Sequence, residues 1–475
     1  MLFCLLLLWL QDPTTVAREH VKKGLELSQN GDLRSANVYL EKALKLNPND
    51  VEASYYLAVN QYRLGQFVPA KANLERILRA KPEMRSATLL LGAVLEKLDD
   101  YRRAIHLLES VTDLVRQQPE WIAILARCYY HTDLAAKARA TLDCMRPAGP
   151  AAIFLGAETA AQSGDLGTAE RLFASIRSTY PDPAQLGYEL AMVQYQAKHY
   201  AESEATLQQL TAAATRESRV YNLLAWCHYR QNRLPEAVAA MNRAIELDPA
   251  AETNYDHLAQ ILIEEGRYAE ATEAAEKAIA VAPNSSAAYQ LRGRAETGIG
   301  NFKLALHSYT RAAELNPADA GALLNLALVQ QKLFQFREAT GSFEKGILRF
   351  PKNPQFYEAY GRMLLVNSSD SGIDGGSHAA SNDARAVSLL EKALALDNQL
   401  AEAHYELGKY LLGQDKVQAA LAHLEAAAKL DPRDSRAALA LASAYRRLGR
   451  NAEAGEQLRK FKELEALKNS SAPPQ

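Results

Sequence analysis

The sequence from Ser286 to Asp319 reads SAAYQLRGRAETGIGNFKLALHSYTRAAELNPAD, and it predicts two short helices joined by a turn. Gly298 and Gly300 are expected to break the first helix, because glycine is costly inside a helix and easily accommodated in a turn. One face of that first helix carries Tyr289, Gly293 and Glu296. In the second helix, aromatic and small residues recur at helical spacing at Phe302, Ala305, Tyr309 and Ala312. Pro317 closes the segment.

The rest of the chain repeats this segment. Thirteen units can be aligned by hand, most of them 34 residues apart, and they start at Ala17, Val51, Arg85, Pro119, Pro150, Ala184, Ser218, Glu252, Ser286, Ala320, Pro354, Ala401 and Ser435. The unit at Pro150 begins three residues early, and the unit at Ala401 begins 13 residues late. Random helical sequence would not keep this phase, so the chain is predicted to be a repeat array.

The order of residues in each unit (aromatic, small residue, glycine turn, alanine, aromatic, alanine, proline) resembles the tetratricopeptide repeat family. A small residue recurs where the two helices of a unit would cross, at Gly24, Ala58, Gly92, Ala126, Ala157, Ala191, Ala225, Ala259, Gly293, Ala327, Gly361, Gly408 and Ala442. The resemblance implies an all-α fold, an α-solenoid that forms a right-handed superhelix of about thirteen helix-turn-helix units. First helices would line a concave groove and second helices would form the outer wall.

The pattern divides the chain into segments. Residues 1–16 are an apolar N-terminus, residues 17–149 hold units 1–4, and residues 150–468 hold units 5–13 with a C-terminal capping helix. A flexible insertion is predicted at 367–383, because its Ser, Gly, Asp and Asn residues bury too little apolar surface to order themselves. The polar tail, residues 469–475, is predicted to be disordered.

Two further features concern the shortened unit that ends before Pro150 and the N-terminus. The sequence DCMRPAGPA at 143–151 predicts a shortened second helix and a local change in superhelix twist, although a neutral deletion is the alternative. The apolar run Leu2–Leu10 is too short to span a membrane and has the length of a signal-peptide core, but it lacks a charged start and a clear cleavage site. We expect export, with a cytoplasmic protein as the alternative.

Several classes of function are not supported by the sequence. A net charge of -2 argues against a dedicated nucleic-acid binder. The four cysteines (Cys4, Cys128, Cys144 and Cys227) form no C-x-x-C pair, and the ten histidines are scattered over different units. No phosphate-binding loop, nucleophile elbow or zinc-protease motif is present. We therefore predict no enzymatic activity, no metal site and no cofactor.

The first helices of the first seven units carry an aromatic stripe that is expected to face the groove. The predicted partner-binding residues are Tyr55, Tyr62, Arg127, Tyr130, Tyr188, Tyr195, Trp226, Tyr229 and Arg230. Tyr, Trp and Arg are enriched at protein interfaces, and Trp226 is the expected anchor. The alternative is that some of these aromatics pack between adjacent first helices. Later units are more polar at the same positions, with Gln260, Glu264, Gln290, Arg294, Lys332, Arg362 and Lys409.

These features predict a non-enzymatic scaffold that binds a segment of a protein partner in the groove. The alternatives are a carbohydrate or cell-envelope polymer binder and an accessory subunit of an envelope or secretion complex. The lysine of the family's chaperone-tail clamp is missing, since the matching positions hold Val21, Tyr55, Leu89 and Phe154. Of the asparagine ladder of sugar-transferase arrays, only Asn325 is present.

Overall fold

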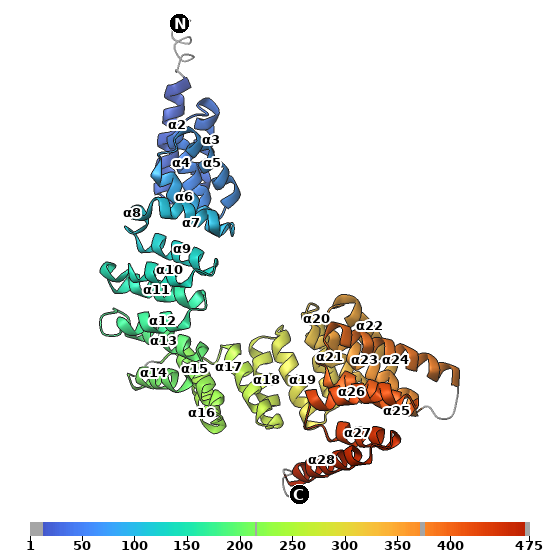
Figure 1. Ribbon diagram of the computed structural model, residues 1–475. Helices are drawn as coiled ribbons and strands as arrows, with labels where there is room; N and C mark the ends of the chain where they lie inside the picture. The colour runs from blue at the N-terminus through green and yellow to red at the C-terminus, as the bar shows by residue number, and fades with distance from the viewer. Residues whose placement is uncertain (1–12, 214–215, 371–375, 471–475) are drawn as a thin grey trace. The chain divides into compact units, whose positions relative to one another are not determined.

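A computed structural model describes residues 13–213, 216–370 and 376–470, and in these residues it contains 27 α-helices and one short 3₁₀ helix. Two compact bodies can be distinguished, the N-terminal body Met1–Ala240 and the C-terminal body Met241–Gln475. The helices form pairs, and within each body consecutive pairs pack against one another along the chain (Figure 1). The fold is therefore an all-α solenoid, as predicted.

The first helix of each pair is α2 (Pro13–Gln29), α4 (Val51–Arg63), α6 (Arg85–Lys97), α9 (Pro119–Tyr130), α11 (Pro150–Gln162), α13 (Pro183–Gln196), α15 (Ser218–Arg230), α17 (Glu252–Glu264), α19 (Ser286–Ile299), α21 (Ala320–Lys332), α23 (Pro354–Asp370), α25 (Ala401–Gly413) and α27 (Ser435–Arg447). Eleven of these thirteen helices begin at the residue where the sequence pattern starts a unit. The exceptions begin at Pro13 and Pro183, slightly before the predicted Ala17 and Ala184.

The second helix of each pair is α3 (Leu33–Leu46), α5 (Phe67–Ala80), α7 (Tyr101–Ser110), α10 (Ala135–Asp143), α12 (Leu166–Ser175), α14 (Tyr200–Ala212), α16 (Leu234–Leu247), α18 (Tyr268–Val281), α20 (Phe302–Leu315), α22 (Phe336–Arg349), α24 (Gly376–Leu396), α26 (Val417–Leu430) and α28 (Asn451–Ser470). The short helix α10 confirms the shortened second helix predicted before Pro150. The sequence pattern did not predict the break after Ser110, where a separate turn of helix, α8 (Thr112–Val115), follows α7.

A residue with positive φ stands in the turn between the two helices of twelve pairs, with φ between 58° and 87°. Six of these residues are glycine, as expected for a left-handed turn, and the others are Asp99, Asp133, Lys198, Asn232, Phe334 and Asp415. Aspartate and asparagine tolerate this conformation because their short side chains bond locally. Phe334 is a bulky exception, and its side chain is 79% exposed.

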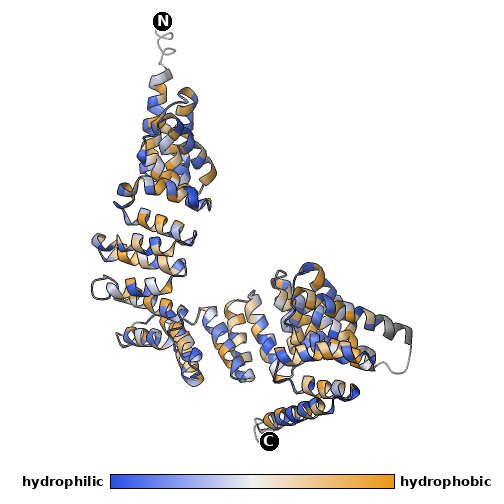
Figure 2. Cartoon of the chain, in the orientation of Figure 1, coloured by the Kyte–Doolittle hydropathy of each residue, from blue (hydrophilic) through white to orange (hydrophobic). Residues whose placement is uncertain are grey.

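Small residues allow the helices to cross closely, as the sequence predicted. Ala58, Ala126 and Ala305 are completely buried, and a Cβ built on Gly408 would lie 2.6 Å from Leu424 Cγ. Figure 2 shows hydrophobic and hydrophilic residues mixed along the helices, as expected for helices with one apolar face. In the N-terminal body, one apolar cluster continues from Ala58 to Val193.

One prediction about the turn residues was wrong. Gly298 does not break the first helix, because α19 continues through it to Ile299 and ends at Gly300, whose φ is 87°. A Cβ on Gly298 would lie 2.4 Å from Tyr268 Cδ1 of the preceding second helix. Glycine is required at this position by the close approach of a ring, and the turn depends on Gly300 alone.

The structure describes only part of the predicted insertion and of the two termini. Helix α23 extends to Asp370 and α24 begins at Gly376, so helix enters the segment 367–383 from both sides, and residues 371–375 lie outside the described residues. Helix α28 likewise continues to Ser470. The predicted signal segment Leu2–Leu10 and residues 471–475 lie outside the described residues. Within the described part of the chain, no helix is long and apolar enough to cross a membrane.

Candidate partner-binding face

All nine predicted binding residues lie on first helices of the N-terminal body, and together we call them the aromatic face. They come from α4 (Tyr55, Tyr62), α9 (Arg127, Tyr130), α13 (Tyr188, Tyr195) and α15 (Trp226, Tyr229, Arg230). Arg230 is exposed and the other eight side chains are half-buried, so each of them retains surface that solvent can reach. The structure groups these nine residues into smaller clusters.

The largest cluster spans α13 and α15. Arg230 Nε donates a hydrogen bond to Tyr195 Oη at 3.2 Å, and the Arg230 guanidinium lies 5.9 Å from the centre of the Tyr229 ring. Tyr229 meets Trp226 edge to face, with ring centres 5.4 Å apart and an interplanar angle of 90°. Four predicted residues from two neighbouring helices therefore form one continuous surface, which we call the Trp226 cluster.

Tyr188 lies beside this cluster on α13 and is covered by a cation that the sequence did not identify. The guanidinium carbon of Arg219, on α15, lies 4.4 Å from the centre of the Tyr188 ring. The Arg219 side chain also pairs with Glu217 at 2.6 Å. Burial raises the pKa of Tyr188, and the nearby Arg219 charge opposes that rise. The sequence spacing of 31 residues between Tyr188 and Arg219 is the only signal that could have found this pair.

Arg127, on α9, forms an ion pair with a carboxylate of the same chain. Its Nε donates to Glu96 Oε1 at 2.8 Å, and Glu96, on α6, is only 7% exposed. Tyr62 of α4 lies near this pair, since its pKa is raised by burial and by the Glu96 charge. The buried carboxylate of Glu96 therefore joins α6 to α9 through Arg127, and its charge also acts on Tyr62 of α4. Arg127 and Lys97 pair with different carboxylate oxygens of Glu96, at 2.8 and 3.2 Å. The internal pairing of Arg127 supports the alternative that some residues of the aromatic face pack between first helices.

The hydroxyl group of Tyr130 also forms a hydrogen bond within the chain. Its Oη donates to Asp165 Oδ2 at 2.9 Å, and Arg139 Nε donates to the same oxygen at 2.7 Å. Asp165 caps α12 by accepting a hydrogen bond from the backbone N–H of Thr168 at 3.3 Å. Burial and the bond to Asp165 both raise the pKa of Tyr130. Tyr55 makes a simpler contact, edge to face with Tyr56, with ring centres 5.8 Å apart.

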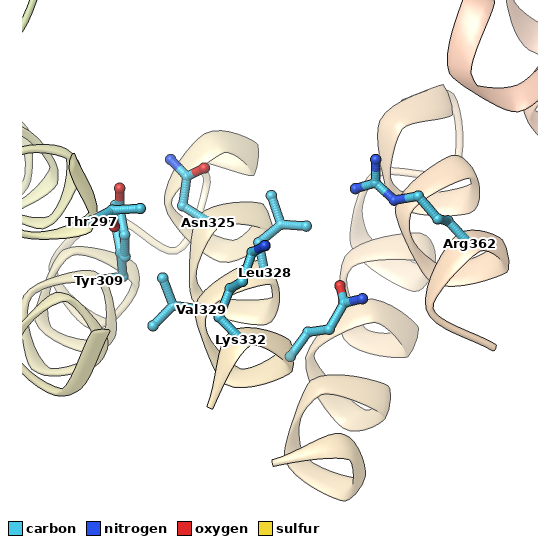
Figure 3. A pocket seen from close by; sticks show the side chains of 8 residues that line it. Thr297, Tyr309, Asn325, Leu328, Val329, Lys332 and Arg362 are labelled. Carbon is cyan, nitrogen blue, oxygen red and sulfur yellow. The ribbon is translucent and has the colours of Figure 1, made fainter. Parts of the chain in front are cut away.

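The C-terminal body has a pocket of about 350 Å³ between α19, α20, α21 and α23, which we call the Arg362 pocket. It is lined by Thr297, Tyr309, Asn325, Leu328, Val329, Gln331, Lys332 and Arg362. Figure 3 shows Arg362 reaching from α23 towards α21, which carries Asn325, Leu328 and Lys332. Arg362 Nη1 lies 3.5 Å from carboxylate oxygens of both Glu358 and Glu402.

The sequence identified some of the residues that line the Arg362 pocket. Lys332, Arg362 and Asn325 were identified as positions on the first helices, and the structure brings them together. Tyr309 was missed because it belongs to a second helix, α20, and Thr297 was missed because it had no chemical motif.

The sequence analysis also missed the exposed Phe334, whose ring lies edge to face with that of Phe336, with ring centres 5.9 Å apart. The only sequence signal for it is a bulky residue at a turn position where most units have Gly, Asp or Asn.

The described residues give no support to catalysis or metal binding. Among them, no group of three or more His, Cys, Asp and Glu side chains is placed to hold a metal ion. Burial raises the pKa of the Cys128 thiol to about 12 and that of Cys227 to about 11, so both are protonated thiols at neutral pH and poor nucleophiles. Both are buried and behave as small hydrophobic residues.

Four family models described as "Tetratricopeptide repeat" match the chain, at residues 95–153 and 160–227, 291–334 and 405–466, 218–251, and 253–285. Together they cover more than half of the chain. The chain belongs to the tetratricopeptide repeat family. A further family model, described as subunit 3 of the anaphase-promoting complex or cyclosome, matches residues 29–111 of this tetratricopeptide repeat protein.

The tetratricopeptide repeat protein is also similar to individual relatives. Mouse tetratricopeptide repeat protein 16 is 29% identical over 140 residues, which are 26% of this chain and 18% of the relative, so the chain spans about a fifth of that protein. Yeast Tom70 is 18% identical, with 96% of both chains covered and a TM-score of 0.41. YrrB, described as a tetratricopeptide repeat protein with an unusual peptide-binding site, is 21% identical, covers 42% of this chain and 95% of its own, and has a TM-score of 0.33.

Proposed function

We propose that this tetratricopeptide repeat protein is a non-enzymatic scaffold that binds a segment of a partner protein along its first helices. Proteins of this family are generally protein–protein interaction scaffolds. The partner segment would be an extended peptide or a helix, held by aromatic anchors and by charged groups at its ends.

The Trp226 cluster is the observation that carries this proposal. It combines Trp, Tyr and Arg, the residue types that most often dominate binding energy at interfaces. Arg230 is exposed and the rings of Trp226 and Tyr229 are only half-buried, so a partner can cover apolar surface there. By contrast, Arg127 and Tyr130 are bound to carboxylates of the protein itself. We therefore assign the anchoring role to the Trp226 cluster and a connecting role to Arg127 and Tyr130.

A peptide-display selection on the full chain tests whether the protein recognises protein segments. The expected result is a set of related peptides that bind reversibly and compete with one another. The competing hypothesis, a carbohydrate or cell-envelope polymer, is tested by pull-down with washed cell envelope and with isolated polysaccharide. Binding that survives protease treatment of that material, together with a failed peptide selection, would contradict the proposed scaffold.

We also propose that the protein is exported, on the strength of the apolar run Leu2–Leu10. The test is the mass of the N-terminus of the protein isolated from its source. A shortened N-terminus on protein from outside the cytoplasm supports export, whereas an intact Met1 on cytosolic protein contradicts it.

A further inference from the structure

A second pocket, of about 290 Å³, lies in the C-terminal body between α23, α24 and α25. We call it the carboxylate pocket and define it by Leu365, Val366, Asp383, Glu406, Lys409 and Tyr410. These six residues come from three helices, so the pair α23–α24 and the following first helix α25 build the pocket together. None of the residues of the Trp226 cluster or the Arg362 pocket belongs to it.

Glu406 is the most unusual residue of this pocket. Its side chain lines the pocket, yet it is only 6% exposed. Within the described part of the chain, no hydrogen bond and no ion pair reaches it. A buried carboxylate without a donor is costly, because burial removes the water that would solvate its charge. Burial accordingly raises the pKa of Glu406, and the charges of Lys409, Arg362 and Arg436 only partly oppose that rise.

Asp383 supplies a second carboxylate from α24. Its Oδ1 atom is shielded from solvent and has no hydrogen-bond partner among the residues that the structure describes. Tyr410 is close enough to Asp383 for that carboxylate to raise its pKa, after burial itself. Two carboxylates from different helices, Glu406 and Asp383, therefore line one cavity, and Asp383 contributes an unsatisfied acceptor.

The cations nearest to this part of the fold are engaged elsewhere. Arg436 Nη1 and Nη2 lie 3.1 and 2.7 Å from the two carboxylate oxygens of Glu402. Arg362 is shared between Glu358 and Glu402 at 3.5 Å. Lys409 is exposed at the pocket without forming an ion pair with Glu406. The lining of the pocket thus holds two carboxylates, Glu406 and Asp383, and one cation, Lys409.

The walls of the pocket suit an aliphatic chain. Leu365 and Val366 of α23 and Tyr410 of α25 all line it. A long cationic side chain could place its stem against these residues and its charged end against the carboxylates. A guanidinium fits two carboxylates on two helices better than an ammonium does, because its planar array of five donors can pair with both at once.

We propose that the carboxylate pocket binds an arginine side chain of a partner protein, with the guanidinium between Glu406 and Asp383 and the aliphatic stem on Leu365 and Val366. The proposal rests on the proposed function in one respect, namely that the occupant belongs to a protein. It gives the C-terminal body a recognition site of its own and adds a basic residue to what the partner must contain.

The test uses the full chain with labelled Leu and Val methyl groups and N-acetyl-arginine methylamide as the probe. The expected result is a saturable shift of the Leu365 and Val366 methyl signals. N-acetyl-citrulline methylamide, which has nearly the same shape without the charge, should produce none. Equal shifts with citrulline, or no shift with arginine, would overturn the proposal. Tighter binding of the lysine analogue or of spermidine would overturn the assignment to arginine.

Substitutions inside and outside the pocket test whether the arginine probe binds at Glu406 and Asp383. Glu406→Gln and Asp383→Asn should each weaken arginine binding at least about tenfold, whereas Glu391→Gln, an exposed position on the same helix as Asp383, should leave it unchanged. Glu406→Gln should also raise the melting temperature, because it removes a buried charge without a partner. A lower melting temperature for Glu406→Gln would show that Glu406 stabilises the fold and would contradict a binding role. Because the probe needs no partner, these results are independent of the peptide selection.

Discussion

The ring of Tyr268 in α18 lies directly against Gly298 in α19, where a Cβ would come within 2.4 Å of Tyr268 Cδ1. Alanine normally stabilises a helix relative to glycine, but here it would collide with an aromatic ring. We expect Gly298→Ala to destabilise the protein by about 1–3 kcal/mol. Gly341→Ala is the matched control, since Gly341 also lies within a helix but has no atom within 4 Å of the point that a Cβ would occupy. That variant should gain up to about 1 kcal/mol. Urea unfolding measures the free energy of unfolding of both variants. An increase in stability for both would contradict the steric explanation.

The same variant tests whether the solenoid unfolds locally. Stability in a repeat array depends on each unit and its neighbours, so damage at Gly298 should stay near α18, α19 and α20. Hydrogen exchange of Gly298→Ala should be faster in those helices and unchanged in α2 and α3. Uniform acceleration along the chain would mean that the protein unfolds as one cooperative domain.

Asp165 should make stability depend on pH. Burial alone would raise its pKa, but hydrogen bonds from Arg139, Tyr130 and Thr168 hold it below its ordinary value of 3.8. Asp165→Asn keeps a good helix cap and loses the charge. At neutral pH we expect a loss of roughly 1–2 kcal/mol.

The pH profile gives the sign of this effect. A lowered pKa means that the ionised carboxylate stabilises the folded state above the unfolded pKa, and that this contribution is lost as pH falls through the folded pKa. The stability difference between Asp165→Asn and the parent protein should therefore be constant above about pH 5 and should shrink as the pH falls below about 4. Asp32→Asn is the comparison for a cap without an arginine or tyrosine partner, because the Asp32 carboxylate accepts a hydrogen bond from Ser35 N–H and its pKa is lowered by Ser35. Its pH profile should have the same sign and a smaller size. A difference that grows on acidification would contradict this assignment.

Phe334 is strained by its backbone conformation, with φ at 61°. Left-handed φ costs a bulky residue about 1–2 kcal/mol, whereas asparagine tolerates it. Phe334→Asn should therefore raise stability by about 1 kcal/mol, and the reciprocal Asn232→Phe, at φ 59°, should lower it. Thermal unfolding measures both changes. Destabilisation by Phe334→Asn would show that the contact with Phe336 outweighs the backbone strain.

The sequence was sufficient for the fold because the repeat period and the small residues at helix crossings carry most of the information. A completely buried Ala305 and a left-handed Gly300 are both read directly from the repeated pattern. Gly298 was misjudged because sequence cannot distinguish a helix break from the close approach of a ring. The absence of a side chain at Gly298 makes room for the ring of Tyr268, which belongs to the neighbouring unit.

The candidate site was predicted less completely. The sequence identified which positions lie on the first helices, but it could not tell which side chains are already bound. Glu96 and Asp165 bind Arg127 and Tyr130 from units one step away, and those pairings depend on side-chain direction. Glu406 was not identified because its importance lies in a missing partner, which only the packed structure reveals.

The central proposal, that the first helices bind a partner through the Trp226 cluster, is tested most directly by Trp226→Ala. Two quantities are needed from the full chain, the affinity for a peptide selected on the parent protein and the melting temperature. Trp121→Ala is the control, because Trp121 lies on α9 outside the aromatic face. Our account predicts that Trp226→Ala weakens binding by about tenfold or more while the melting temperature hardly changes. Unchanged affinity, or a large loss of stability typical of a core tryptophan at about 3–5 kcal/mol, would contradict it.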